Sequence, residues 1–570
     1  MRRIIFLFFL FFACIETALS QVPDFLPPIS DGQLYLSGTF GELRSNHFHS
    51  GIDIKTGGAI GKKVVAVYDG YISRISVSPY GYGKAIYITH PNGYTSVYGH
   101  LDHFRKDIAD YVVKYQYEKE SFNANIFLNA ETFPVKRGDI IAWSGNSGGS
   151  AGPHLHFEIR ETKSERPIDP MQFKLPVKDW TKPKIIALRI YPYGNNSFVN
   201  GKNEVCKKTT NGWGENYHLL DNDTLYLQGP IYFGINAYDA MNDISNKNGI
   251  YSLLCLVDND TLYHIENDGF LFSESKYINS VIDYKYFINS KARYYRTLHE
   301  PNNKLQMVKN VDNNGIVNLS DDSIHKVKFV VKDSYLNTSA LSFNIVRDTN
   351  YYEPTDTISK DYFFRYFTTN KLSFDDFKLQ MEAYTLFNDL AFDFNIVDAQ
   401  AKDLSPTYVV GDNTLVTFKT FKISIKINDT LDDNIKPHLY IAAQNQKNWN
   451  YVGGTISDGW ISLWTRNFGS YKLLCDTIPP EIKCASLKPK IANNVSGKQE
   501  IKVIIKDKTS GIKSYTPTLN GEWILMDYDA KNSLLVYKFD KRIKKGNNIF
   551  KIVVTDNCNN TYEFERVLNY

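Results

Sequence analysis

Short runs of alternating apolar and polar residues dominate the chain and predict strands. Between residues 32 and 173, runs such as VVAVYDGYISRISVS, KAIYITHPNGYTSVYGHL and DIIAWSGNSGG are separated by glycine-containing turns. A period of two sends neighbouring side chains to opposite faces, as in a half-buried antiparallel sheet. We therefore expect residues 21–178 to form a small all-β domain.

One segment of this region departs from the alternation. FRKDIADYVVKYQYEKES, residues 104–121, carries Ile108, Val112 and Tyr115 at helical spacing with charged residues between them. We expect an inserted helix here. It follows His100 closely, where it could either narrow a substrate cleft or act as a lid.

The remaining two thirds of the chain contain an internal repeat. Each copy has an aspartate followed by a Gly-Ile pair, at Asp239 and at Asp507, and the copies end in VVKDSYLNT and VVTDNCNNT. Strands broken by Asn, Asp and Gly turns over such lengths are typical of immunoglobulin-like sandwiches. We predict such β-sandwiches at 179–347 and 478–570.

A different unit is expected between the two copies, at residues 348–477. It opens with an expected helix at 374–390 and continues with strands such as TFKISIKI. This makes it a mixed, mainly β domain, and the fold class of the whole chain is mainly β.

Composition narrows the function classes. The 570 residues carry 65 basic and 62 acidic side chains, a net charge of +3, which argues against a nucleic-acid binder. The 39 Tyr and 35 Phe favour strands. Apart from Cys14, five scattered cysteines without a CxxC pair do not make a disulfide framework.

The N-terminal stretch MRRIIFLFFLFFACIETALSQ has two arginines, an apolar run and a small-residue ending. This is the pattern of a secretory signal peptide, residues 1–20, cleaved before Gln21. An uncleaved anchor and a lipoprotein acylated at Cys14 are the alternatives. We expect a secreted or periplasmic protein with no transmembrane segment after cleavage.

Seven of the twelve histidines fall between His47 and His156. HFHSGIDIKT places His49 and Asp53 in an H-x-G-x-D pattern, SVYGHL ends a strand near His100, and GPHLHFEIR puts His154 and His156 on one strand face. Each is weak alone.

Together these residues match the needs of a catalytic zinc ion. Such an ion takes three protein ligands and keeps a fourth position open, lowers the pKa of water to about 7 and polarises a carbonyl. His49, Asp53 and one ring of the H-x-H pair supply three ligands. The other ring can accept a proton, since an unperturbed histidine titrates near pH 6.5.

H-x-G-x-D, YGHL and GNSGGSAGPHLHFEIR, in this order and followed by RPIDPMQF, resemble the lysostaphin-like zinc metallopeptidases over roughly residues 36–170. The resemblance implies a duplicated hybrid motif β-barrel. It further implies that His49, Asp53 and His156 bind zinc and that His154 is the general base. His100 would orient the water or stabilise the oxyanion.

The substrate class also follows from the resemblance: this family cleaves glycine bridges or stem-peptide cross-links of peptidoglycan. We favour the cross-links.

Other positions near the motifs have weaker expectations. The glycines of the 148–152 loop would allow a tight turn, Ser147 and Ser150 could bond substrate, and His47 is expected to be exposed. Glu158 would orient a ligand or pair with Arg160 or Arg44. Some relatives carry a tyrosine upstream of the first ligand, where this chain has Phe40, Leu43 and Arg44.

The leading hypothesis is a zinc metalloendopeptidase acting on peptidoglycan peptides, whose sandwich domains bind the wall or envelope proteins or act as spacers. The alternative is an inactive envelope regulator that activates other cell-wall hydrolases. A structural adhesin is a third interpretation, but it leaves the histidines unexplained. For the enzyme, we expect activity to fall below about pH 6, where protonated histidines bind no zinc.

Overall fold

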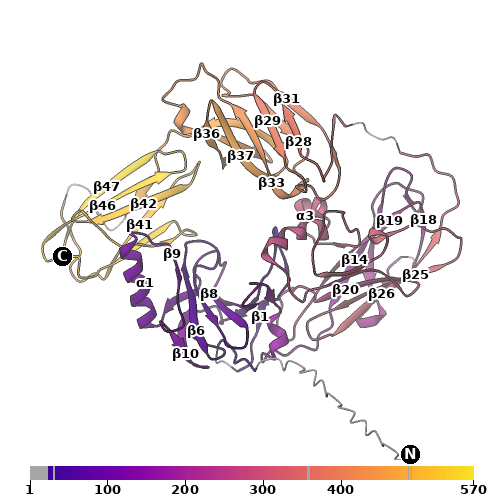
Figure 1. The fold of residues 1–570 in the computed structure, drawn as a ribbon, viewed down its shortest axis with the longest axis horizontal. Helices are drawn as coiled ribbons and strands as arrows, with labels where there is room; N and C mark the ends of the chain where they lie inside the picture. The colour runs from indigo at the N-terminus through magenta and orange to yellow at the C-terminus, as the bar shows by residue number, and fades with distance from the viewer. Residues whose placement is uncertain (1–23, 30–31, 222, 356–359, 485–486, 489–490) are drawn as a thin grey trace, which may run out of the picture.

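The computed structural model describes residues 24–29, 32–221, 223–355, 360–484, 487–488 and 491–570. Four β-rich units follow one another around a ring, and the last unit returns to the first (Figure 1). The chain is mainly β, as expected. The expected signal peptide lies outside the described residues.

The first unit is built on one large sheet, in which the order β1–β4–β12–β8–β7–β6–β10 forms the main path. The strands of the path are β1 (Leu36–Gly38), β4 (Ile52–Lys55), β12 (His154–Glu161), β8 (Tyr94–Phe104), β7 (Lys84–Thr89), β6 (Gly70–Val77) and β10 (Pro134–Val135). Shorter strands join them: β5 (Lys63–Val65), β9 (Ala124–Phe127), β11 (Ile140–Ser144) and β13 (Pro167–Ile168). A separate hairpin is formed by β2 (Leu43–Arg44) and β3 (His47–Phe48).

Strand β12 shows how the sequence pattern builds this sheet. Leu155, Phe157 and Ile159 are fully buried in the core of the unit. The residues that alternate with them, His154, His156 and Glu158, therefore share the opposite face. Because β12 pairs with β4 on one side and β8 on the other, these three side chains have a neighbouring strand on each side.

A helix does occur within the segment expected to be helical: α1 (Lys106–Glu118). It buries Ile108 and Val112 in the core of the first unit. Its exposed side contacts the last unit, where the Tyr117 hydroxyl accepts from the Leu525 amide and donates to Asp540. The groove described below is lined by no residue of α1, so the helix is a docking platform for the last unit and neither narrows the groove nor covers it.

The second unit is a sandwich of a six-stranded and a seven-stranded sheet. The first sheet contains β14 (Lys184–Pro192), β16 (Cys206–Asn211), β17 (His218–Leu219), β19 (Ile231–Tyr238), β22 (Tyr295–Arg296) and β24 (Ile316–Val317). The second contains β15 (Phe198–Val199), β18 (Thr224–Gln228), β20 (Ser252–Val257), β21 (Asp260–Glu266), β23 (Val308–Val311), β25 (His325–Lys332) and β26 (Thr338–Arg347). Two short helices are inserted, α2 (Ile278–Val281) and α3 (Tyr284–Ser290).

This second unit is docked tightly on the first. Its hydrophobic core includes Phe40, Leu43 and Phe48, which belong to the segment around the β2–β3 hairpin. The Ser275 hydroxyl also accepts from the Phe48 amide at 3.1 Å. The residues leading to His49 are thus held by the second unit.

The third unit packs two five-stranded sheets and a two-stranded ribbon. Its strands are β27 (Tyr362–Phe364), β28 (Asn370–Ser373), β29 (Phe377–Met381), β30 (Leu390–Phe392), β31 (Phe394–Val397), β32 (Thr407–Val410), β33 (Val416–Lys426), β34 (Leu439–Asn445), β35 (Asn448–Gly453), β36 (Thr455–Ser457), β37 (Trp460–Asn467) and β38 (Gly469–Cys475).

The prediction of a helix at 374–390 is wrong. The segment contains β29, in which Phe377, Leu379 and Met381 are buried alternately and which pairs with β28 and β33. Apolar residues at 374, 377 and 381 also fit a helical spacing, so only pairing with neighbouring strands separates the two interpretations.

The fourth unit is a smaller sandwich of four and five strands. They are β39 (Glu481–Lys483), β40 (Asn493–Asn494), β41 (Glu500–Lys506), β42 (Ile512–Leu519), β43 (Glu522–Trp523), β44 (Asp527–Asp529), β45 (Leu534–Lys538), β46 (Asn547–Asp556) and β47 (Thr561–Asn569).

The second and fourth units share an unusual strand pairing. An early strand runs parallel to the last one in each: β18 with β26, and β40 with β47. This agrees with the internal repeat in the sequence; the immunoglobulin-like topology and the domain boundaries stay predictions. No helix in the described part of the chain is long and apolar enough to cross a membrane.

Candidate metal centre

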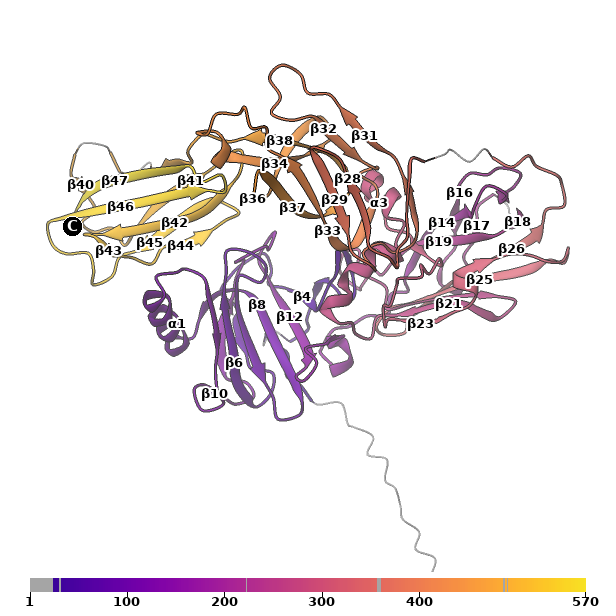
Figure 2. The same ribbon diagram turned by 45° about the horizontal axis from the view of Figure 1, so that its top comes forward.

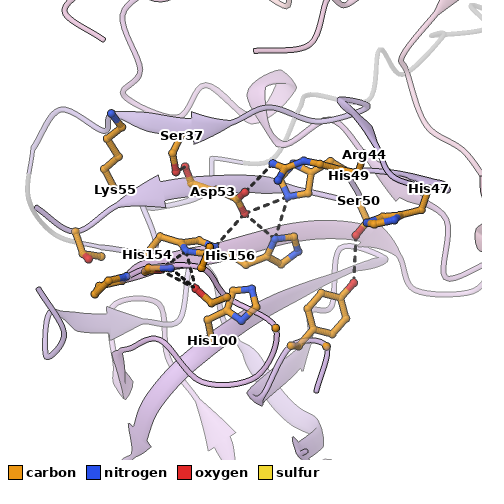
Figure 3. A pocket seen from close by; sticks show the side chains of 18 of the residues that line it. Ser37, Arg44, His47, His49, Ser50, Asp53, Lys55, His100, His154 and His156 are labelled. Carbon is orange, nitrogen blue, oxygen red and sulfur yellow. Dashed lines mark hydrogen bonds and ion pairs between the residues drawn. The ribbon is translucent and has the colours of Figure 1, made fainter. Parts of the chain in front are cut away.

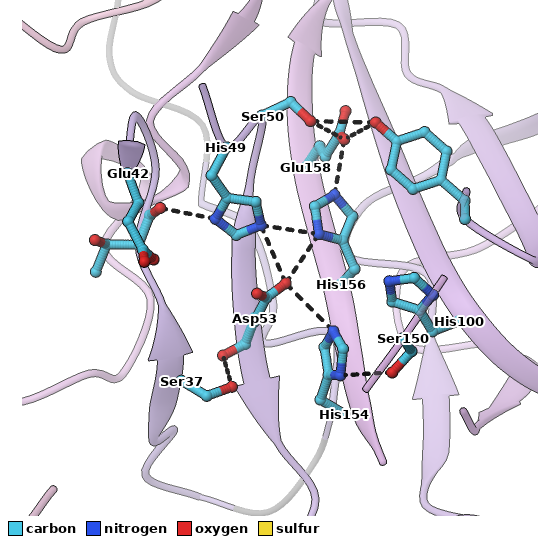
Figure 4. A network of polar contacts seen from close by, with 12 residues as sticks. Ser37, Glu42, His49, Ser50, Asp53, His100, Ser150, His154, His156 and Glu158 are labelled. Atoms are coloured by element: carbon cyan, nitrogen blue, oxygen red, sulfur yellow. Dashed lines mark hydrogen bonds and ion pairs between the residues drawn. The ribbon is translucent and has the colours of Figure 1, made fainter. Parts of the chain in front are cut away.

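Three side chains converge on the face of the first sheet that points away from the hydrophobic core (Figure 4). His156 on β12 stands directly opposite Asp53 on β4, and His49 lies in the turn that precedes β4. His156 Nδ1 is 3.0 Å from Asp53 Oδ1, and His49 Nε2 is 3.1 Å from both atoms. All three residues are buried.

The glycine of H-x-G-x-D is required by this packing. A Cβ atom on Gly51 would lie 2.3 Å from the Phe157 carbonyl oxygen and 2.8 Å from a side-chain carbon of Glu158. No larger residue fits between β12 and the turn that carries His49. The central glycine of the motif is therefore required by packing, whereas the histidine and the aspartate at its two ends supply the polar groups.

Hydrogen bonds fix which ring nitrogens face inward. His49 Nδ1 donates to the Thr39 carbonyl oxygen at 2.8 Å, and His156 Nε2 donates to the Glu158 carboxylate at 2.8 Å. The neutral rings therefore turn the lone pairs of His49 Nε2 and His156 Nδ1 toward each other and toward Asp53. Such a cluster of lone pairs needs a cation or a proton between them.

The geometry fits zinc. Tetrahedral ligand atoms at about 2.0–2.1 Å from zinc lie roughly 3.3 Å apart, near the 3.0–3.1 Å separations found here. Two imidazoles and one carboxylate are also the donor types of catalytic zinc sites.

The charge of the cluster is set by its neighbours. Burial would raise the pKa of Asp53, but His49 and bonds from His154 and His156 hold it well below its usual range. Arg44 also binds Asp53 Oδ2 at 3.0 Å, leaving Oδ1 for the cluster. Burial would lower the pKa of His156, but its contacts to Asp53 and Glu158 raise it to about 9. A proton and a metal ion therefore compete for Nδ1.

Glu158 lies behind His156 and is fully buried. Its carboxylate accepts from Ser50 at 2.6 Å, Tyr82 at 2.5 Å and Arg160 Nε at 2.7 Å, in addition to His156. Burial would raise the pKa of Glu158, but Arg160 and the His156 bond lower it overall. Glu158 therefore bonds the His156 ring and pairs with Arg160, whereas its orienting of a metal ligand stays a prediction.

Glu158→Gln is expected to lower zinc affinity by about 10–100-fold, because the amide no longer fixes the tautomer of His156. Competition with a zinc indicator measures this. Glu165→Gln is the matched control, since Glu165 also pairs with Arg160 but is largely exposed. Equal affinities for the two variants would contradict a positioning role.

His154 and His100 lie beside the cluster. His154 Nδ1 donates to the Gly152 carbonyl oxygen at 2.8 Å and is 3.2 Å from the Ser150 hydroxyl, while its Nε2 points to Asp53 Oδ1 at 3.4 Å. The His100 ring lies 4.7 Å from the His154 ring between centroids. The structure thus brings together all five residues that the sequence singled out.

His100 is held in an unusual backbone conformation. Its φ is +58°, a region that non-glycine residues rarely adopt. Its Nδ1 donates to the Ser147 carbonyl oxygen at 2.8 Å, which leaves Nε2 as an acceptor. Burial and the neighbouring His156 and His154 lower the pKa of His100 to about 3, so the ring is neutral at physiological pH.

The cluster lies in a groove of about 1040 Å³ (Figure 3). One wall is the loop from Gly149 to Pro153 before β12, and another is the segment His47–Ser50. Phe272 and Ser275, from the second unit, complete the lining. Lys531 of the fourth unit reaches the same loop, donating to the carbonyl oxygens of Asn146 and of Ser150, the latter at 3.0 Å.

The weaker expectations have mixed outcomes. His47 is exposed, as expected. Gly148 has φ +68° and packs against Gly83, so it serves the loop, whereas Gly152 faces open space. Ser147 donates to the Leu101 carbonyl oxygen, while Ser150 lies on the groove beside His154.

Two residues at the groove were not predicted from the sequence. Tyr82 lies between strands β6 and β7 in sequence, and its ring is 5.1 Å from that of His156 between centroids. Phe272 comes from another unit, more than 100 residues along the chain. Tyr82 follows a glycine turn, a weak signal for a site; nothing in the sequence around Phe272 indicates the groove.

Two family models match the chain. The peptidase family M23 model matches residues 47–117 and 123–170, the segment that carries the histidine cluster. A Zu5-like domain model matches residues 361–476, which correspond to the third unit.

Curated relatives match part of the chain. The DD-carboxypeptidase/endopeptidase Mpg of Neisseria meningitidis serogroup B is 29% identical over 140 residues, which are 25% of this chain and 26% of the relative. The peptidoglycan DD-endopeptidase ShyB of Vibrio cholerae is 33% identical over 129 residues, 23% and 24% of the two chains. The glycyl-glycine endopeptidase ALE-1 of Staphylococcus capitis is 30% identical over 173 residues, 30% and 36%.

The chain therefore spans only a quarter to about a third of the length of these relatives. The family model covers the segment with H-x-G-x-D, His100 and H-x-H, on the sheet described above. The N-terminal unit of this chain is a lysostaphin-like peptidase domain of family M23.

Proposed function

We propose that this chain is a zinc metalloendopeptidase that hydrolyses peptide bonds in bacterial peptidoglycan, with stem-peptide cross-links as its substrate. The observation that carries the proposal is the convergence of His49 Nε2, Asp53 Oδ1 and His156 Nδ1 beside a further histidine in an open groove. These three atoms would hold the metal.

Zinc, when bound there, would supply a Lewis acid that makes water more acidic and polarises the scissile carbonyl. The remaining chemistry belongs to the chain. Arg44 keeps the second oxygen of Asp53 occupied, and Glu158 keeps the His156 ring in the ligating tautomer. Both reduce the reorganisation that metal binding requires.

His154 is the general base in this proposal. Because its Nδ1 donates to the Gly152 carbonyl oxygen, Nε2 has a lone pair directed at the cluster. Nε2 accepts a proton from the attacking water as the C–O bond forms, and returns it to the amine nitrogen as the C–N bond breaks. The products are a carboxylate and an amine.

His100 orients the water and does not donate to an oxyanion. A neutral ring that donates from Nδ1 to Ser147 can only accept at Nε2. A second acceptor beside His154 fixes the water by one of its two hydrogens. This favours the first of the two roles expected for His100.

The substrate class is supported by the relatives: ShyB is a peptidoglycan DD-endopeptidase, Mpg is a DD-carboxypeptidase/endopeptidase and ALE-1 is a glycyl-glycine endopeptidase. Two of these three relatives are DD-endopeptidases, which favours stem-peptide cross-links as the substrate. Peptidoglycan lies in the cell envelope, which agrees with the expected signal peptide and with a secreted or periplasmic location. Envelope proteins are candidate partners for the sandwich units.

The test is digestion of defined muropeptides by the full-length protein after its zinc content has been measured. We expect about one zinc per chain and hydrolysis of D-alanyl cross-links to monomers, identified by mass spectrometry. Cleavage confined to glycyl-glycine bridges would overturn the choice of bond. A zinc-loaded protein that cleaves neither substrate would favour the alternative, a regulator of other wall hydrolases.

A further inference from the structure

A cluster of three aspartates lies outside the peptidase groove, in the second unit. Single carboxylate oxygens of Asp179, Asp239 and Asp333 lie within 4.8 Å of one another. Asp179 precedes β14, whereas Asp239 and Asp333 directly follow β19 and β25. Three sequence-distant carboxylates thus meet at one end of the sandwich.

The fourth unit repeats this cluster. Asp476, Asp507 and Asp556 also bring carboxylate oxygens within 4.8 Å, and they occupy the corresponding places: before β39, after β41 and at the end of β46. An asparagine supports each copy in the same way. Asn337 Nδ2 donates to Asp333 Oδ2 and to the Asp179 carbonyl oxygen, and Asn560 Nδ2 donates to Asp556 Oδ2 and the Asp476 carbonyl oxygen.

Each cluster contains at least one buried carboxylate oxygen that no donor in the described part of the chain satisfies. These are Asp179 Oδ2 and Asp239 Oδ1 in the second unit and Asp476 Oδ2 in the fourth, on residues that are 8%, 1% and 2% exposed. Asn248, whose backbone pairs with that of Asp239, is also buried with both amide atoms unsatisfied. Buried polar atoms without partners cost free energy, so a missing ligand is indicated.

Burial raises the pKa of carboxyl groups in both clusters. Burial and the negative charges of Asp179 and Asp333 raise the pKa of Asp239 well above its usual range. Burial also raises the pKa of Asp179 to about 7. In the fourth unit, burial is the main cause that raises the pKa of Asp556, and Asp476 adds to it.

We propose that each of these triads is a calcium-binding site, so that the chain binds two Ca²⁺ ions in addition to the metal of the groove. Hard cations take carboxylate and carbonyl oxygens, and Ca²⁺ lies about 2.3–2.6 Å from each. Two oxygens on one such ion are at most roughly 5 Å apart, which the 4.8 Å limit satisfies. Three carboxylates offer up to six oxygens, whereas zinc would prefer nitrogen or sulfur donors.

Both sites lie where a sandwich meets the unit before it. After Asp333, Ser334 donates to Asp169 and the Tyr335 hydroxyl donates to the Val177 carbonyl oxygen, both in the peptidase unit. After Asp556, the Cys558 carbonyl oxygen accepts from His438 of the third unit. A calcium ion would tie the linker aspartate, Asp179 or Asp476, to the loop that makes these contacts.

We expect calcium to stabilise the ring-like arrangement of the four units. Calcium at Asp179 and Asp476 would fix the angles at these two linkers, and with them the contact of Lys531 with the Ser150 carbonyl oxygen of the peptidase loop. Figure 2 shows β44 and β45 of this unit above helix α1 of the peptidase unit.

The test is calorimetric titration of Ca²⁺ into the full-length protein, freed of calcium on a chelating resin and kept in zinc-containing buffer so that the histidine site is filled. We expect two Ca²⁺ per chain. Asp239→Asn and Asp507→Asn are each expected to bind one, and the double variant none. Asp260→Asn, an exposed position of the second unit, is the control and binds two.

Thermal unfolding gives an independent measurement. Without calcium, the double variant should unfold at a higher temperature than the wild type because it lacks the carboxylate repulsion. With saturating calcium the order should reverse, with the wild type gaining about 5 °C or more. A merely structural carboxylate would not reverse the order.

Absence of calcium binding to the folded wild type, or two ions retained by the double variant, would overturn the proposal. Tighter binding of Mg²⁺ than of Ca²⁺ would overturn the choice of cation. One ion lost only with Asp239→Asn would support the first site and reject the second. These outcomes do not depend on cleavage of peptidoglycan.

Discussion

His154→Ala is expected to lower kcat for muropeptide cleavage by about 10²–10⁴-fold while zinc stays bound. The variant keeps His49, Asp53 and His156, whose inward-facing atoms lie 3.0–3.1 Å apart. It removes the only proton acceptor proposed to shuttle between the water and the leaving amine. Steady-state cleavage of a cross-linked dimer, with zinc content measured in parallel, gives both quantities.

His103→Ala is the control for this experiment. His103 is an exposed histidine of the same unit that stacks on Trp143 and does not line the groove, so we expect the wild-type rate. If His154→Ala kept the wild-type rate with zinc bound, another group would be the base.

His49→Ala is expected to abolish both zinc binding and cleavage. Two ligands remain, too few for a catalytic site, which takes three protein ligands. Loss of the metal removes several kcal/mol of transition-state stabilisation, equivalent to at least roughly 10³-fold in rate. Zinc content by mass spectrometry and the cleavage assay measure the two effects.

The matched control for zinc is His47→Ala. His47 lies two residues earlier, is exposed and bonds only the Ser45 carbonyl oxygen among described partners, so zinc should be retained. Retention of a full equivalent of zinc by His49→Ala, or its loss from His47→Ala, would contradict the ligand set.

The connection between the units adds a property that an isolated peptidase domain lacks. Phe272 of the second unit lines the groove and also stacks under Arg160, the partner of Glu158. Lys531 of the fourth unit holds the carbonyl oxygen of Ser150, whose hydroxyl is 3.2 Å from His154 Nδ1. The surroundings of His154, the proposed base, therefore depend on residues more than 100 and more than 350 positions away in sequence.

The sequence by itself determined most of the secondary structure and which histidine and aspartate side chains face the groove. Alternation along GPHLHFEIR puts His154 and His156 on one face regardless of the rest of the fold, because the side-chain period of a strand is two. The spacing of H-x-G-x-D keeps His49 and Asp53 near each other along the chain, but His49 lies in a turn, so its direction depends on packing. Helix α1 was predictable too, since its apolar residues recur at helical spacing.

Only the tertiary structure decided what depends on contacts between distant segments. The register of β12 against β4 sets His156 opposite Asp53, and Gly51 leaves the room for it. Segment 374–390 was ambiguous by pattern and became strand through pairing with β33. The docking of Phe272 and Lys531, and the meeting of the aspartates in each triad, are likewise long-range. Local pattern encodes the faces of a strand, but which faces meet is decided by packing.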